Sequence, residues 1–76
     1  MLTGRQIREA RKLLGLDRSV LAQKVGRITT LAIMRAEESE DEPTLSPEQD
    51  ALVRQTLERL GVEVGPRRVR LQEQKP

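Results

Sequence analysis

The segment DRSVLAQKVGRITTLAIMRAEE, residues 17–38, decides how this chain folds. Its first half predicts a short helix, because Asp17 is a good N-terminal capping residue whose charge suits the positive end of a helix. Three apolar residues recur at helical spacing on the inward side: Leu21, Ala22 and Val25. Gly26 ends the helix, because glycine adopts the backbone conformations that close one. A helix of about two turns is marginal alone, so tertiary packing must hold it.

The second half of the segment predicts another helix directly after a tight turn. Residues 26–28 form the turn, and Thr29 caps a helix over about residues 30–38. Ile33 and Ala36 form its buried side. Two short helices joined in this way are the unit that places its second helix in the major groove of DNA.

Another helix is predicted before this unit, over about residues 4–14. Thr3 and Gln6 have the spacing of a capping box at its start, and Gly15 is a natural end. Its inward side is expected to carry four apolar residues at helical spacing: Ile7, Ala10, Leu13 and Leu14.

An acidic, proline-containing loop over residues 39–45 separates the unit from a fourth helix. Ser46 and Pro47 start this helix as capping serine and first-turn proline, and Gly61 is expected to end it. Four residues are expected to be buried: Leu52, Val53, Leu57 and Leu60.

Beyond the fourth helix the hydrophobic period changes to two. Residues 62–64 and 69–71 alternate apolar and polar side chains around the turn 65–68, which predicts two short strands. An isolated hairpin is only marginally stable, so the strands are expected to pack on the helices or to pair with another chain. The predicted fold is mainly α, a compact four- to five-helix domain over residues 1–71 with a short C-terminal β-hairpin or strand pair and a flexible tail at 72–76.

Composition narrows the possible functions. The chain has 76 residues, enough for one domain, and contains no cysteine, histidine, phenylalanine, tyrosine or tryptophan. The usual zinc ligands and the commonest general base are therefore absent, and no motif of an enzyme, cofactor site or metal site is found. We expect a non-enzymatic protein without cofactor or metal. No signal peptide or membrane span is recognisable, so a cytoplasmic, nucleoid-associated location is expected.

Charge is unevenly distributed along the chain. Residues 1–36 carry eight basic and two acidic side chains, a net charge of +6, whereas residues 37–50 carry seven acidic and no basic ones. Residues 51–76 carry six basic and three acidic side chains, a net charge of +3. A basic amino-terminal half is typical of a surface that faces phosphates, although a solvated helical face has the same composition.

Several motifs together resemble the XRE family of Cro/repressor-type, lambda-repressor-like helix-turn-helix proteins. The resemblance covers about residues 3–71 and is carried by Thr3-Gly4-x-x-Ile7-Arg8-x-Ala10-Arg11-x-Leu13-Leu14-Gly15-Leu16, Leu21-Ala22-x-x-Val25-Gly26, Ile33-Met34-Arg35-Ala36-Glu37, Leu57-Glu58-x-Leu60-Gly61-Val62-Glu63-Val64 and Val69-Arg70-Leu71. It implies a sequence-specific transcription regulator that binds double-stranded DNA, usually as a homodimer on a partly palindromic operator.

The resemblance also implies a set of DNA-contacting residues. Arg18 lies where the family meets phosphate or base, and Arg35 lies where it tends to have a phosphate-contacting base. The full expected set is Arg18, Ser19, Arg27, Thr29, Thr30, Leu31, Met34 and Arg35. For Thr29 a purely capping role is an alternative, and for Leu31 and Met34 the alternative is packing against a neighbouring helix or a partner.

Some features depart from the family pattern. Arg27 is interpreted as an inserted residue, since the ungapped alignment would bury its charge. The predicted second helix of the unit has no arginine, asparagine or glutamine at its exposed start to read bases. Five acids follow closely, and we expect them to point away from DNA, toward the basic first helix of a neighbouring molecule: Glu37, Glu38, Glu40, Asp41 and Glu42. Val20, predicted to be exposed, could mark a partner surface.

These departures motivate a second hypothesis. The chain would then be a protein-binding module on the same fold, of the antiactivator or antitoxin kind, which engages another protein instead of DNA.

Overall fold

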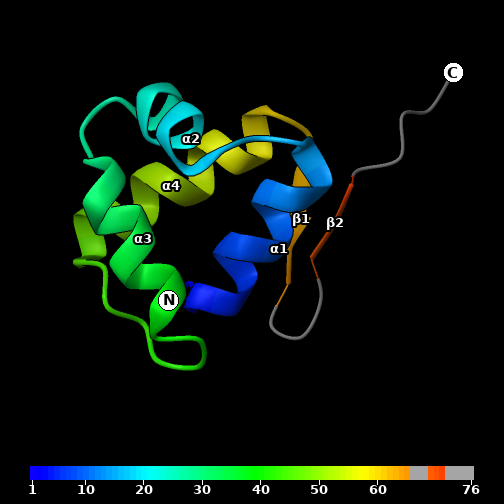
Figure 1. Ribbon diagram of the computed structural model, residues 1–76. Coiled ribbons are helices and arrows are strands. Elements are labelled where there is room, and N and C mark those ends of the chain that lie inside the picture. Colours follow the sequence, from blue (N-terminus) through cyan, green and yellow to red (C-terminus); the bar gives the residue numbers. More distant parts are fainter. Residues whose placement is uncertain (66–68, 72–76) are drawn as a thin grey trace, which may run out of the picture.

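A computed structural model describes residues 1–65 and 69–71 of the chain. Four helices and a two-stranded antiparallel sheet follow one another along it (Figure 1). The elements are α1 (Gly4–Leu14), α2 (Arg18–Val25), α3 (Thr30–Glu38), α4 (Pro47–Arg59), β1 (Val62–Val64) and β2 (Val69–Leu71). The expectation of a mainly helical chain with a short terminal strand pair is confirmed.

The start and end of α1 follow from local chemistry. The Thr3 hydroxyl oxygen accepts the backbone N–H of Gln6 at 3.2 Å, and the Gln6 side-chain oxygen accepts the N–H of Thr3 at 2.9 Å. Gly15, with φ of 68°, adopts the left-handed conformation that ends the helix. The predicted bounds of α1 are confirmed.

At the ends of the other helices, one predicted cap is wrong in its mechanism. Ser46 and Gln49 form a capping box at the start of α4, as Thr3 and Gln6 do for α1. Asp17 occupies the N-cap position of α2, but its side chain accepts no hydrogen bond there, so only its charge favours the helix start. The last residue of α4 is Arg59, followed by Leu60 as the capping residue.

The helices pack around one core. In Figure 1, α3 lies on the left, α1 in the centre and the strand pair on the right, with α2 and α4 above and behind. The buried apolar residues come from every helix, the N-terminal residues, the loop before α4 and β1: Leu2, Ile7, Ala10, Leu21, Ala22, Ile33, Ala36, Leu45, Val53, Leu57 and Val62.

Two predicted side-chain positions are wrong. Leu13, expected to face inward, is 44% exposed, because it lies about 120° around the helix from Ile7. It borders the strand pair, where it lines a shallow hollow with Val69. Val20, expected to be exposed, is half-buried.

The strands pack on the bundle, which was one of the two expected outcomes. β1 and β2 pair antiparallel with Val62 opposite Leu71, Glu63 opposite Arg70 and Val64 opposite Val69, so Val62 points into the core. Arg70 forms an ion pair with Glu63 at 3.2 Å on the outer face. The turn after Gly65 and the predicted tail at 72–76 lie outside the described residues.

Candidate nucleic-acid interface

The connection between α2 and α3 exposes the first turn of α3. Gly26, with φ of 94°, turns the chain after α2. The Thr29 hydroxyl oxygen then accepts the N–H of Ala32 at 3.1 Å and caps α3. Because Ile33 is fully buried on the inner side of α3, the residues on the opposite side are left toward solvent.

All eight predicted contact residues lie on α2, the connection and α3. Seven are exposed, namely Arg18, Ser19, Arg27, Thr29, Thr30, Leu31 and Arg35. Met34 is half-buried, so part of its side chain is packed against the protein and only the rest is accessible. Thr29 does act as a cap, whereas Leu31 is 47% exposed and so is not buried against a neighbouring helix.

The turn between α2 and α3 keeps Arg27 out of the core. Arg27 is exposed, while Ile28 is half-buried and packs against the core. The turn therefore keeps the charge in water and places the apolar side chain inward, as the physical cost of burying an arginine demands.

A buried ion pair joins the helices of this region. Glu37 of α3 is 2% exposed, and its two carboxylate oxygens each accept a hydrogen bond of 2.9 Å from Arg11 of α1. Arg11 also donates to the backbone oxygen of Leu16 at 3.0 Å. The hydrogen bonds to Glu37 raise the pKa of the Arg11 guanidinium above its ordinary value, although burial acts in the opposite direction. This pair fixes α3 on α1.

Arg18 joins the same carboxylate from α2. Its Nε donates to Glu37 at 3.3 Å, while 45% of its side chain stays exposed. Sequence reasoning placed Arg18 on the DNA surface and did not foresee this intramolecular bond. The residue is thus held in place at the solvent boundary between α2 and α3.

The acidic loop after α3 folds onto α1 of its own chain. Asp41 and Glu40 form ion pairs with Arg5 at 3.1 and 3.6 Å, and Glu40 pairs with Arg8 at 3.3 Å. The backbone N–H of Arg5 also donates to the Glu40 carbonyl oxygen at 2.9 Å. The expectation that these acids reach a neighbouring molecule is therefore corrected. The loop is distant from α1 in the sequence, but the fold brings its acids into contact with Arg5 and Arg8.

The loop and the first turn of α3 lie at opposite ends of that helix. In Figure 1, α3 descends from the connection after α2 to the loop near the N-terminus of the chain. The paired acids are consequently separated from Thr30 and Leu31 by the length of α3.

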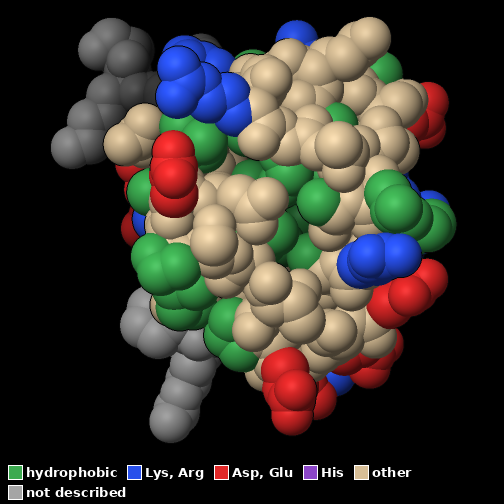
Figure 2. All heavy atoms as spheres, turned by 90° about the vertical axis from the view of Figure 1, so that its left-hand side faces the viewer, with side chains coloured by type: hydrophobic (Ala, Val, Ile, Leu, Met, Phe, Trp, Pro, Cys, Tyr) green, Lys and Arg blue, Asp and Glu red, His purple; other side chains and the backbone are tan. Residues whose placement is uncertain are grey.

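The surface on the α3 side carries little charge. Figure 2 looks at the molecule from the left of Figure 1 and shows mostly backbone and uncharged polar side chains. Hydrophobic side chains lie in a hollow near the centre of this face, and the lysine, arginine and acidic side chains in view are scattered toward its edges. One shallow hollow on α3 is lined by Leu31, Ala32, Arg35 and Leu45.

Sequence reasoning missed two residues that hold this arrangement, Arg11 and Asp50, and one contact of a third, Gln6. Arg11 is the main partner of Glu37, and its position four residues after the buried Ile7 was a signal that could have found it. Asp50 accepts the N–H of Leu2 and so fastens the N-terminus to α4. Gln6, besides its capping role, donates from its side chain to the Gly65 carbonyl oxygen at 3.0 Å.

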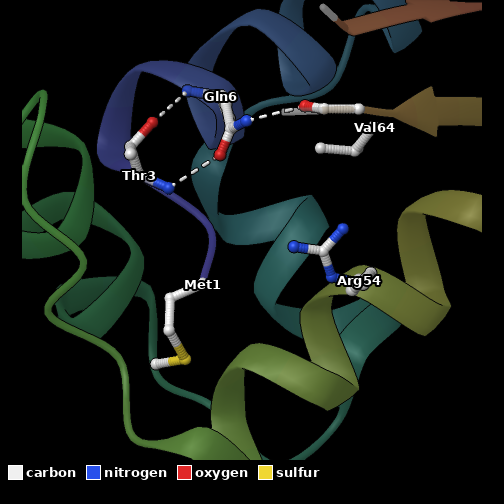
Figure 3. A pocket seen from close by; sticks show the side chains of 6 residues that line it. Met1, Thr3, Gln6, Arg54 and Val64 are labelled. Atoms are coloured by element: carbon white, nitrogen blue, oxygen red, sulfur yellow. Dashed lines mark hydrogen bonds between the residues drawn. The ribbon is translucent and has the colours of Figure 1, made fainter. Parts of the chain in front are cut away.

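Figure 3 shows the surroundings of Gln6. Its amide lies between Thr3 and the end of β1, and Met1 and Arg54 border the same hollow. Arg54 pairs with Asp50 at 3.9 Å. Because the Gln6 amide is occupied on both its oxygen and its nitrogen, this corner serves to join α1 to the strand pair.

No protein-family model matches this sequence, and no curated protein and no solved structure matches it either. Among residues 1–65 and 69–71, acidic side chains do not gather in a group of three or more that could hold a metal ion. None of the helices described there is long and apolar enough to cross a membrane.

Proposed function

We propose that this chain is a sequence-specific DNA-binding transcription regulator with a lambda-repressor-like, XRE-type helix-turn-helix unit at residues 17–38. One observation carries the proposal: the first turn of α3 projects into solvent after a tight turn that exposes Arg27, and Arg18 of α2 and Arg35 of α3 are exposed as well. In this proposal α3 enters the major groove. The protein acts at the nucleoid in the cytoplasm and is not an enzyme.

The exposed residues divide by chemistry into two roles. Arginines at the border of the interface suit phosphate oxygens, which fix the position of the protein without reading sequence. Thr30 and Leu31 lie between them on α3 and would meet the base edges. The ion pairs of Glu40 and Asp41 with α1 support this orientation, since they neutralise acids that would otherwise repel phosphates.

The functional unit in this proposal is a homodimer. Two copies of α3 about 34–36 Å apart would reach successive major grooves of a partly palindromic operator. A core of small aliphatic residues supports the idea, since a second copy adds buried area, and α4 with the strand pair is the expected contact. Light scattering over a dilution series tests it, and a mass that stays monomeric at all concentrations, with and without DNA, would refute the dimer.

A binding titration across a salt series tests the proposal as a whole. Fragments from the genetic neighbourhood of the protein are labelled, and binding is followed by fluorescence anisotropy. We expect affinity to fall steeply with salt, because each neutralised phosphate releases counterions. Absence of binding at low salt, or binding that salt does not change, would refute DNA binding.

A second function deserves a test because the α3 side is sparsely charged. Its hydrophobic hollow and the exposed Leu31 could together form the surface on which a protein partner binds. The chain would then be an antiactivator- or antitoxin-like module. Stoichiometric binding of one defined protein, lost in Leu31→Asp and retained in Leu13→Asp, together with no DNA binding at low salt, would favour this function over the first.

A further inference from the structure

The side of α3 that faces solvent offers methyl groups where a base-reading helix usually offers amides or guanidiniums. Thr30 and Leu31 are exposed, and Met34 follows one turn after Thr30 with part of its side chain accessible. Residues four apart on a helix are neighbours on its surface, so Thr30 lies beside Met34 and Leu31 lies beside Arg35. Three of these four side chains end in or carry a methyl group.

Two polar groups at this surface already have partners within the protein. The hydroxyl oxygen of Thr29 accepts the Ala32 N–H, and Glu37 is enclosed by Arg11 and Arg18. Arg35, near the last turn of α3, is the first guanidinium on the helix. Two amides lie beside this side: Gln23 of α2 lines a hollow with Thr29 and Thr30, and Gln49 of α4 lines another with Leu31 and Arg35.

The major groove presents one apolar group at its base edges, which is the C5-methyl of thymine. Guanine and cytosine are read best by bidentate arginine and by carboxylates, neither of which stands at the start of α3. A side chain of leucine or methionine gains most by covering a methyl group and excluding water from it. An amide such as Gln23 reads adenine, the partner of thymine, so it favours the same base pairs.

We infer that α3 recognises thymines through their C5-methyl groups, with Leu31 as the main contact and Thr30 and Met34 beside it. The operator therefore carries thymines at the positions opposite these three residues. This inference rests on the proposed function, because it concerns the DNA bound by the same surface.

Replacement of thymine by uracil tests the inference directly, since uracil lacks only the C5-methyl group. Duplexes are first selected from a random-sequence pool, and the best binder is then prepared with thymine and with uracil. Affinity should fall about fourfold for each contacted thymine that is replaced. Placing 5-methylcytosine opposite guanine at a selected thymine position should recover part of the loss, since its methyl occupies the same place in the groove.

Two variants locate the effect. Leu31→Ala should reduce the thymine-to-uracil affinity ratio about fourfold and leave the salt dependence unchanged. Leu13→Ala is the matched control, because Leu13 is similarly exposed but lies on α1 beside the strand pair. It should keep the full ratio. Circular dichroism verifies that both variants fold.

The possible failures are distinguishable. Salt-dependent binding with equal affinity for the thymine and uracil duplexes would overturn the inference and leave the proposed function standing. Absence of salt-dependent binding to either duplex would overturn the proposed function and the inference together. A ratio that Leu31→Ala does not change would refute Leu31 as the main contact.

Discussion

Gly4 of α1 lies directly against the backbone of Ala36 in α3. A β-carbon built on Gly4 would stand 2.0 Å from the Ala36 carbonyl oxygen and 2.9 Å from the Glu37 α-carbon. Both neighbours are backbone atoms, so no side chain could rotate away to make room. This close approach sets how α3 is seated on α1 and hence how its first turn is presented to solvent.

Gly4→Ala should therefore destabilise the protein. Helix propensity alone predicts a gain of about 1 kcal/mol for this change in α1. The contact with Ala36 predicts the opposite sign, because overpacking a rigid site costs about 1–3 kcal/mol. Urea unfolding followed by circular dichroism measures the difference. A variant as stable as the wild type would show that the two backbones are farther apart.

Gly15→Ala is the matched control for a glycine effect. A β-carbon on Gly15 meets no atom within 4 Å, so the only penalty is its φ of 68°. Left-handed backbone costs a residue with a side chain about 1–2 kcal/mol. The two variants thus separate the stability lost through a steric clash from the stability lost through an unfavourable backbone conformation.

Removing the charge of the buried Glu37 carboxylate tests how α3 is held on α1. Glu37→Gln removes the charge but keeps the shape, and leaves Arg11, whose side chain is 13% exposed, with a neutral partner. Removing one member of a buried pair costs about 3–5 kcal/mol, which is much of the stability of a small domain. Glu38→Gln, at an exposed neighbouring position, should change the free energy of unfolding by less than about 0.5 kcal/mol.

The pH dependence of this pair follows from Arg11. Because its pKa is raised in the folded state, its contribution is complete at every pH below the ordinary arginine pKa and is lost only in strong alkali. Removing the charge of Arg11 with Arg11→Met should thus lower stability equally at neutral and mildly alkaline pH. If Arg11→Met lowered stability only above or only below neutral pH, the residue would be paired with a group other than Glu37.

The proposed DNA-binding role of the exposed arginines makes a quantitative prediction. Arg27→Ala and Arg35→Ala should each weaken binding to all sequences and reduce the slope of log affinity against log salt by about 0.9. Arg18→Ala should do the same, and its effect on folding is checked separately because it also removes one hydrogen bond to Glu37. Lys12→Ala, at an exposed position of α1, is the control, and an equal slope change there would show that net charge alone is responsible.

The acidic loop should oppose DNA association at long range. Neutralising Glu40 and Asp41 frees Arg5 and Arg8 from ion pairs that are largely solvent-exposed, so stability should change by no more than about 1 kcal/mol. Association with DNA should become several times faster at low salt, and the gain should vanish at high salt as the charges are screened.

A charge-matched variant separates position from net charge. Glu48→Gln with Glu58→Gln changes the net charge by the same amount at exposed positions of α4. If that variant accelerates association as much as the loop variant does, the pairing of the loop with α1 has no particular role.

Element bounds could be read from the sequence because local chemistry decides them. Thr3 with Gln6, Thr29 and Pro47 start helices through bonds or backbone angles that span three residues or fewer. Gly15 and Gly26 end helices because of their own backbone freedom. The exposure of Leu31 followed from the same helical period that buried Ile33.

Only the tertiary structure decided which distant groups meet. Arg11 and Arg18 reach Glu37 across 26 and 19 residues of chain, and Arg8 reaches Glu40 across 32. Val20 was predicted to be exposed from its place on the helix, yet it is half-buried in the folded chain. Such pairings depend on how helices are placed relative to one another, and that placement emerges from packing the whole chain around its core.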